Sequence, residues 1–189
     1  MPDERHAAAR PRSPYEGKLI RLRAREPEDE PLLYQWFNDP EVTEFLSIRY
    51  PLSHAQERAF IESMSEISYN KASFGVETLA DGRLIGGVGL ERTSPEDRSA
   101  VLGIALGDKT YWDSGYGTDT MRTICRFGFE MMNLHRIELD VFEPNKRAIA
   151  VYERVGFQVE GRRREARYQF GAYADVVVMG LLEGELIGE

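Results

Sequence analysis

Two glycines separated by a single residue, Gly115 and Gly117, mark the part of the chain whose chemistry is easiest to read. The apolar segment 100–107 before them has the composition of a buried strand, and apolar residues recur at helical spacing over 121–132 after them. Glycine allows a ligand to approach the backbone closely, and the free N–H groups in the first turn of a helix attract negative charge. The sequence therefore predicts that residues 114–119 hold a phosphate-bearing ligand.

Two common nucleotide-binding patterns do not fit these glycines. A Walker A loop has Lys-Ser or Lys-Thr after its second glycine, whereas Thr118 and Asp119 follow here. A dinucleotide fingerprint has a third glycine where Thr120 stands, and it needs a βαβ unit that the preceding segments do not form. What remains is a phosphate bound mostly by backbone groups, without a metal ion.

A second group of residues lies in a predicted helix that begins at Asn145. Asn145 lies just after a predicted strand, where its side chain could cap the helix or hold a ligand amide. Tyr152 comes seven residues later, about two helical turns, so both side chains share one face. Taken separately, a helix cap and a half-buried tyrosine explain these residues equally well.

The elements that must position these residues form a single mixed α/β domain in this interpretation. We expect residues 1–14 to be a loose tail and residues 15–189 to be the domain. The predicted strands are 18–23, 73–79, 84–91, 100–106, 136–142, 157–168 and 173–182, and the predicted helices are 27–37, one from Ser53 across Phe60, Ile61 and Met64, one after Gly117, and 145–155.

Composition limits the classes of function. Of 189 residues, 42% are hydrophobic and 30% are charged, as in ordinary globular proteins, and no apolar run reaches the roughly 18 residues of a membrane helix. The net charge of −8 argues against a nucleic-acid partner. A single cysteine, Cys125, excludes a disulfide framework and favours a reducing cytoplasm. Its position among apolar helix residues predicts that it lies in the core. Four arginines within 162–167 indicate either a solvated strand or a site for an anionic ligand or partner.

The two groups of residues, in this order, resemble the GNAT superfamily of acyl-CoA-dependent N-acetyltransferases. The family's phosphate loop is Gln/Arg-x-x-Gly-x-Gly/Ala, and Trp112 departs from it at the first position, as in the subgroup resembling ribosomal-protein alanine and spermidine acetyltransferases. The resemblance implies a mostly antiparallel, splayed sheet of about seven strands flanked by about four helices. The family's second motif, Asn-x-x-Ala-x-x-x-Tyr-x-x-x-Gly-Phe, is matched by Asn145, Ala148, Tyr152, Gly156 and Phe157.

Acetyl-CoA is the co-substrate that this resemblance implies, with no metal. Its pantetheine arm would pair with the splayed strand and contact Asn145, and its pyrophosphate would rest on the N–H groups of the phosphate loop, residues 114–118. The implied cofactor-binding residues are Ile104, Ala105, Leu106, Ser114, Gly115, Tyr116, Gly117, Thr118, Asn145, Ala148 and Tyr152.

Acetyl transfer to an amine requires a neutral amine, a donor for the oxyanion and a proton for the leaving thiolate. The resemblance assigns the oxyanion to an N–H group of the splayed strand and the proton to Tyr152, because a phenol with a pKa near 10 is protonated at neutral pH. Glu91 is the predicted base, acting through water, although a surface salt bridge explains it equally well. Weaker candidates are Glu44, Glu77, His54 and His135.

The acceptor slot would include the loop 42–51, which holds aromatic residues, one acid and one arginine. A peptide N-terminus, an amino acid or a small amine such as an antibiotic fits this composition. A polyamine would need several carboxylates, which the loop lacks, and it remains an alternative. A further alternative is an acyl-CoA sensor or interaction module without turnover. Family analogy alone suggests a homodimer.

Overall fold

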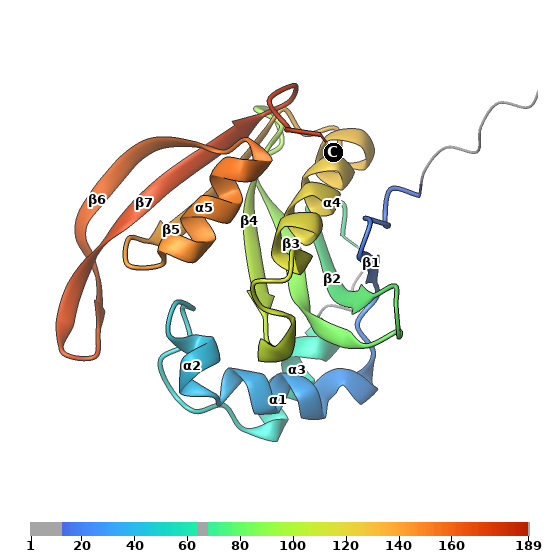
Figure 1. Cartoon of the computed structure of the whole chain (residues 1–189), viewed down its shortest axis with the longest axis vertical. Helices are drawn as coiled ribbons and strands as arrows, with labels where there is room; N and C mark the ends of the chain where they lie inside the picture. The colour runs from blue at the N-terminus through green and yellow to red at the C-terminus, as the bar shows by residue number, and fades with distance from the viewer. Residues whose placement is uncertain (1–12, 64–67, 189) are drawn as a thin grey trace, which may run out of the picture.

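The computed structural model describes residues 13–63 and 68–188 and is drawn in Figure 1. In the described residues, seven strands form one sheet in the order β1-β2-β3-β4-β5-β7-β6. In chain order the elements are β1 (Ile20–Arg23), the 3₁₀ turn η2 (Pro27–Asp29), α1 (Glu30–Phe37), α2 (Pro40–Thr43), α3 (His54–Ser63), β2 (Lys71–Thr78), β3 (Leu84–Ser94), β4 (Ser99–Leu106), the 3₁₀ turn η3 (Lys109–Tyr111), α4 (Tyr116–Met131), β5 (Arg136–Phe142), α5 (Lys146–Val155), β6 (Gln158–Gln169) and β7 (Ala172–Leu182).

The sheet opens between its two central strands. β4 and β5 are its one parallel pair, and they pair only where residues 99–101 meet residues 136–138. Beyond that point β4 continues alongside β3, and β5 continues alongside β7. The edges of β4 and β5 that face each other therefore carry backbone groups without a strand partner. This confirms the expectation of a mostly antiparallel, splayed sheet.

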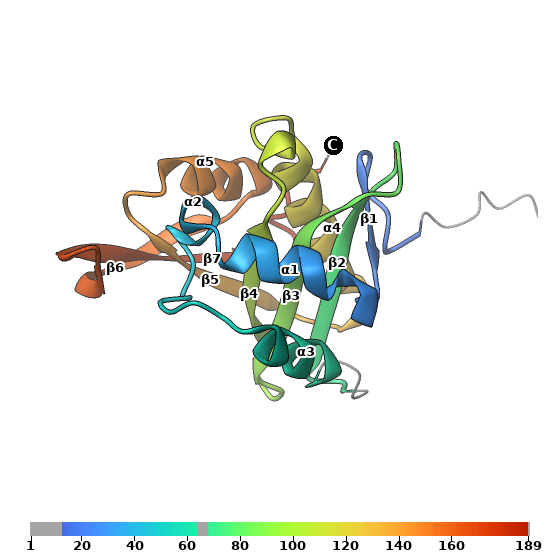
Figure 2. The same cartoon turned by 90° about the horizontal axis from the view of Figure 1, so that it is seen from below.

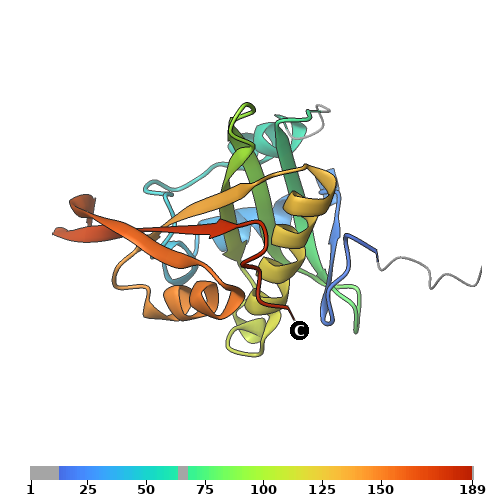
Figure 3. The same cartoon turned by 90° about the horizontal axis from the view of Figure 1, so that it is seen from above.

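Helices cover the two faces of the sheet unequally. Figures 2 and 3 show α4 and α5 on one face and α3 on the other. The main core lies under α4, where Met121, Ile124 and Cys125 are completely buried against the sheet. A smaller core joins α1, α2 and α3 and contains Leu33 and Trp36. Among the described residues, no helix combines the length and apolar character that crossing a membrane requires.

Most predicted elements are present, with their ends shifted by a few residues. A capping box begins α3, since Ser53 N–H donates to Gln56 Oε1 over 2.9 Å and Gln56 N–H donates to Ser53 Oγ over 3.3 Å. The described residues contain five α-helices rather than about four, because a short helix, α2, follows α1 and ends inside the expected loop 42–51. Asp39 caps it by accepting the Glu41 N–H over 2.9 Å, and Pro40 occupies its first position. The predicted contribution of Met64 to α3 lies outside the described residues, as does most of the expected tail.

Candidate active site

A cavity of about 860 Å³ lies where β4 and β5 separate. Its wall includes the β4 residues from Val101 to Leu106, residues 139–142 of β5, and parts of α4, α5, β6 and the loop 42–51. Both groups of residues that the sequence singled out meet at this cavity. Elements distant in the chain thus converge on the gap in the sheet.

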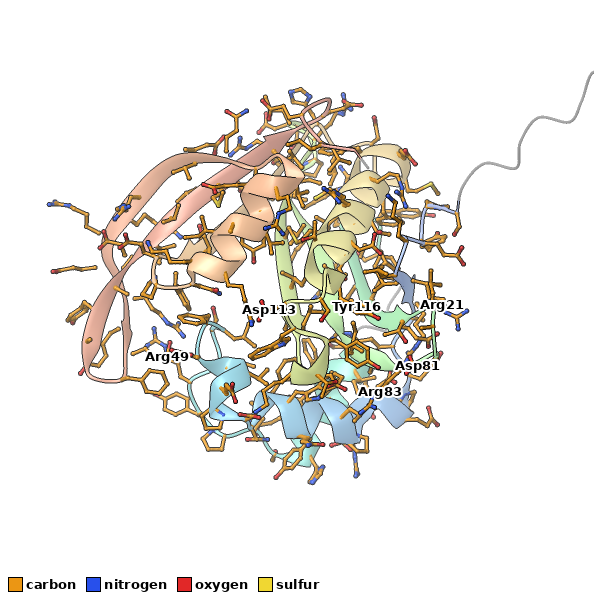
Figure 4. The ribbon with its side chains drawn as sticks, viewed as in Figure 1. Arg21, Arg49, Asp81, Arg83, Asp113 and Tyr116 are labelled. Atoms are coloured by element: carbon orange, nitrogen blue, oxygen red, sulfur yellow. The ribbon has the colours of Figure 1, made fainter. Side chains whose placement is uncertain are left out.

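The phosphate loop forms one end of this cavity. Gly115 is the N-cap residue of α4 and has φ of 88°, a left-handed conformation that strains any residue with a Cβ atom. Gly115, Gly117 and Thr118 line the cavity, whereas Ser114 and Tyr116 do not. The Tyr116 ring instead packs edge-on against Tyr111, 5.0 Å away, and Figure 4 shows Tyr116 on the side of Asp81 and Arg83. The first N–H groups of α4 have no partner within the helix, as an anion site requires.

Two arginines of α5 bring positive charge to the phosphate loop, and sequence reasoning missed both. Arg154 Nη1 lies 3.4 Å from the Thr118 hydroxyl oxygen. The Arg147 guanidinium stacks 4.2 Å from the centre of the Trp112 ring. Trp112 also donates its Nε1–H to the Leu106 carbonyl oxygen over 2.9 Å, which ties the loop to the end of β4. The residue that departs from the family motif thus positions a cation that the motif does not include.

Asp119 stabilises the start of α4 from behind. Its buried carboxylate accepts the backbone N–H groups of Lys18, Leu19 and Ile20 over 3.0, 2.7 and 3.1 Å. In the sequence, Asp119 only ruled out a Walker A loop. In the structure it joins β1 to the helix that carries the phosphate loop, so its role is positional.

The free edge of β4 forms the middle of the cavity. Ile104, Ala105 and Leu106, the three residues predicted to contact the pantetheine arm, all line it. Gly103 lines it as well, and a Cβ atom placed there would meet no atom within 4 Å. The absence of a side chain at Gly103 therefore leaves open space beside the unpaired backbone of β4.

The facing wall comes from α5. Asn145 caps this helix, because its Oδ1 accepts the Ala148 N–H over 3.1 Å, and its NH₂ group remains available to a ligand. Asn145, Ala148 and Tyr152 all line the cavity. Burial raises the pKa of Tyr152 to about 12. No residue that the structure describes forms a hydrogen bond with its hydroxyl group.

The predicted base and its alternatives lie outside the residues that line the cavity. Glu91 is exposed, but its partner across the β3–β4 ladder is Val101, which lines the cavity. Glu77 is buried in ion pairs with two arginines of β1, and the His54 Nδ1 is 2.7 Å from a Glu30 carboxylate oxygen. His135 lies 3.9 Å from a Glu183 carboxylate oxygen, and Glu44 is exposed.

The cluster of four arginines divides between the surface and the cavity. Arg162 forms ion pairs with Glu143 and Asp175 at 2.9 and 3.4 Å. Arg163 pairs with Asp140, and both residues line the cavity. Arg164 is exposed outside the cavity, whereas Arg167 is 7% exposed and lines it. Two of the four arginines thus line the cavity, and an anionic ligand at this cluster stays a prediction.

The cavity suits a ligand with phosphates at one end and a narrow arm next to them. The glycines and free N–H groups of the phosphate loop, with Arg147 and Arg154 beside them, match the phosphates. The unpaired edge of β4 and the open space at Gly103 match an extended arm with amide groups. The residues present therefore fit acetyl-CoA.

Comparisons with known proteins agree with this geometry. The sequence family described as acetyltransferase (GNAT) domain matches residues 20–158. The chain is 31% identical over 173 residues to the probable N-acetyltransferase YjcK of Bacillus subtilis (strain 168), covering 88% of this chain and 95% of the relative. It is 29% identical over 171 residues to the uncharacterized N-acetyltransferase p20 of Bacillus licheniformis, covering 89% and 96%.

A solved structure supports both the fold and the co-substrate. The crystal structure of spermidine N-acetyltransferase from Vibrio cholerae in complex with CoA and spermine matches with a TM-score of 0.80 and 26% identity, covering 88% of this chain and 96% of that chain. The chain therefore belongs to the GNAT acetyltransferase family and is an acetyl-CoA-dependent N-acetyltransferase.

Proposed function

We propose that the protein acetylates a primary amine that enters the cavity between the loop 42–51 and β6, with Tyr152 as the general acid. Acetyl-CoA supplies the activated acetyl group. The supporting observation is that the phosphate loop, the free edge of β4 and Tyr152, from three separate elements, all line one cavity. The residues of the chain must then provide a base, a donor for the negative charge on the acetyl oxygen and a proton for the departing sulfur.

Tyr152 has the protonation state that the acid role requires. With a pKa of about 12 it keeps its proton throughout the physiological pH range. This pKa is above that of a thiol, about 8.5, so transfer of the Tyr152 proton to the thiolate is uphill. Tyr152 therefore stabilises the departing sulfur mainly by donating a hydrogen bond, and the proton that the amine releases on attack restores the phenol once it has protonated the thiolate. The free edge of β4 supplies the N–H group for the acetyl oxygen.

Glu91, acting through water, is the base in this proposal. Cross-strand neighbours lie on the same face of a sheet, so the Glu91 side chain lies beside that of Val101 at the margin of the cavity. Glu91 forms no ion pair with any described residue. The carboxylates that line the cavity are already occupied, since Glu41 pairs with Lys109 at 2.7 Å, Asp140 pairs with Arg163, and Asp113 lies 3.7 Å from Arg147.

A substitution tests this base directly. Glu91→Gln should lower kcat/KM by about tenfold or more at pH 7, and the loss should shrink as the pH approaches the pKa of the acceptor amine. The matched control is Glu96→Gln, which removes an exposed carboxylate outside the cavity, in the turn between β3 and β4. A pH profile identical to that of the unmodified protein would remove Glu91 from the mechanism.

Two classes of acceptor come into question, a polyamine and an amine with a single ammonium group. A spermidine acetyltransferase among them makes a polyamine the alternative acceptor. A polycation needs free carboxylates, and those lining the cavity are each paired with a cation of the protein. This favours an acceptor with a single ammonium group, such as an amino acid, a peptide N-terminus or a small amine.

Thiol release from acetyl-CoA in the presence of an amine panel tests the proposal as a whole. Cys125 is completely buried and burial raises its pKa, so the protein adds little background to a thiol reagent. We expect release that depends on the amine and falls strongly in Tyr152→Phe. Tight CoA binding without release on any amine would instead identify a sensor.

A further inference from the structure

Arg167 is a buried cation without a counter-ion. Its side chain, 7% exposed, donates from Nη2 to the Leu46 carbonyl oxygen over 2.6 Å and lies 3.3 Å from Gln169 Oε1. Its guanidinium also stacks 4.6 Å from the centre of the Phe142 ring. None of these partners carries a charge, and Arg167 forms no ion pair with a carboxylate of the described residues. A guanidinium in such a place normally has an anion beside it.

A second unpaired cation faces the same part of the cavity. Arg49 belongs to the loop 42–51, lines the cavity and makes no ion pair with a described residue. Figure 4 shows Arg49 between α2 and the β6–β7 hairpin. Burial, and then the charge of Arg49, lower the pKa of Arg167, as expected for two like charges on the same cavity wall. The arginine pair, Arg49 and Arg167, therefore leaves positive charge uncompensated at this end.

The neighbouring arginines do not share this property. Arg162 and Arg163 already have carboxylate partners on β5, β7 and the segment after β5. Arg147 and Arg154 belong to α5 and lie beside the phosphate loop, where phosphates account for them. The arginine pair comes instead from the loop 42–51 and β6, which form the part of the cavity assigned to the acceptor.

We propose that the arginine pair binds a carboxylate of the acceptor, so that the substrate is a primary amine that also carries a carboxylate, with a free amino acid as the simplest case. This inference rests on the proposed function, because it names the acceptor class of that same site. Two guanidinium groups hold a carboxylate through several charge-assisted hydrogen bonds. They would also repel the second ammonium group of a polyamine.

Matched acceptors test the arginine pair on the full-length protein. The proteinogenic amino acids and their carboxamides differ only in the carboxylate, and thiol release gives kcat/KM for each. We expect the preferred amino acid to exceed its carboxamide, and spermidine, by about tenfold or more, as for loss of a charge-assisted hydrogen bond. Equal rates for acid and carboxamide, or a preference for spermidine, would overturn the inference while leaving acetyl transfer established.

Substitutions at Arg49 and Arg167 test whether these two residues cause the preference for the amino acid over its carboxamide. Arg49→Gln should raise KM for the amino acid about tenfold and leave KM for acetyl-CoA and the carboxamide rate nearly unchanged. Arg164→Gln, on the same hairpin but outside the cavity, is the matched control and should leave every constant unchanged. Because Arg167 also holds the Leu46 carbonyl, it is tested as Arg167→Lys, which keeps the charge and should weaken amino-acid binding less than Arg49→Gln. An equal loss for acid and carboxamide in Arg49→Gln would contradict carboxylate recognition.

Two further measurements keep the outcomes separate. A dipeptide moves the carboxylate one residue away from the amine, so its rate tells a free amino acid from a peptide as the source of the carboxylate. If no amine releases thiol, the proposed function fails, and calorimetric titration of the amino acids into the protein with CoA then decides the site alone. Binding that Arg49→Gln abolishes would support the arginine pair, and absence of binding would overturn it.

Discussion

At the phosphate-loop end of the cavity the chain offers backbone N–H groups, which Gly115 and the start of α4 leave open, whereas at the opposite end it offers the side chains of Arg49 and Arg167. The first end depends on a turn of a few consecutive residues. The second depends on β6 reaching the loop 42–51, where Arg167 bonds a carbonyl 121 positions away. The family's co-substrate can therefore be recognised by a local turn, whereas the acceptor site that we propose needs side chains that only the whole fold brings together.

Tyr152 lines the same cavity and is the proposed acid for the sulfur, so removing its hydroxyl should affect turnover with every acceptor. We expect Tyr152→Phe to lower kcat by about 10² to 10⁴, the range for loss of a general acid, with both KM values nearly unchanged. Steady-state kinetics with acetyl-CoA and two unlike amines measures this. Because the hydroxyl bonds no described residue, the free energy of unfolding at pH 7 should stay the same. Loss confined to one amine would mean that Tyr152 recognises the acceptor rather than the sulfur.

Asp119 tests how far the phosphate-loop end depends on packing behind it. Asp119→Ala leaves three backbone N–H groups of residues 18–20 without their acceptor, and should lower the free energy of unfolding by about 3 kcal/mol. Asp119→Asn keeps one acceptor oxygen and should lose less. Urea unfolding of the three proteins gives the values. If alanine and asparagine cost the same small amount, β1 is held to α4 by other contacts.

A substitution at Gly115 tests whether the backbone of the phosphate loop binds acetyl-CoA. Gly115→Ala places a Cβ atom in a left-handed conformation, at a cost of about 1–2 kcal/mol, and should raise KM for acetyl-CoA about tenfold with no change in acceptor KM. Gly171→Ala is the matched control, because Gly171 also has positive φ, 80°, but lies in the β6–β7 turn. The control should lose stability without any change in KM for acetyl-CoA. Equal KM values for the two variants would remove the special role of the phosphate loop.

These two ends also differ in how much of them the sequence predicts. The Gly-x-Gly turn, the Asn145 cap and the strands around them follow from patterns within a few residues, and the structure reproduces them. The buried position of Arg167, the stacking of Arg147 on Trp112 and the three N–H groups on Asp119 join residues from separate elements. No local pattern marks these contacts, because burial and the choice of partner are decided by packing. The short helix α2 was missed for a different reason, since Asp39 and Pro40 read equally well as the end of α1.

The smallest expected effect is on the pH dependence of stability, and it comes from the burial of Tyr152 in the cavity wall. Its pKa rises from 10.0 to about 12 on folding, so above pH 10 the unfolded chain loses this proton first. Proton loss by the unfolded state lowers stability as the pH rises, so this share of stability is intact below pH 10 and is lost between pH 10 and about 12. Urea unfolding at pH 8 and pH 11 should therefore show a smaller alkaline loss for Tyr152→Phe than for the unmodified protein. Equal losses would mean that solvent reaches the phenol in the folded protein. Tyr152 would then act in a hydrated part of the cavity rather than in a desolvated reaction centre.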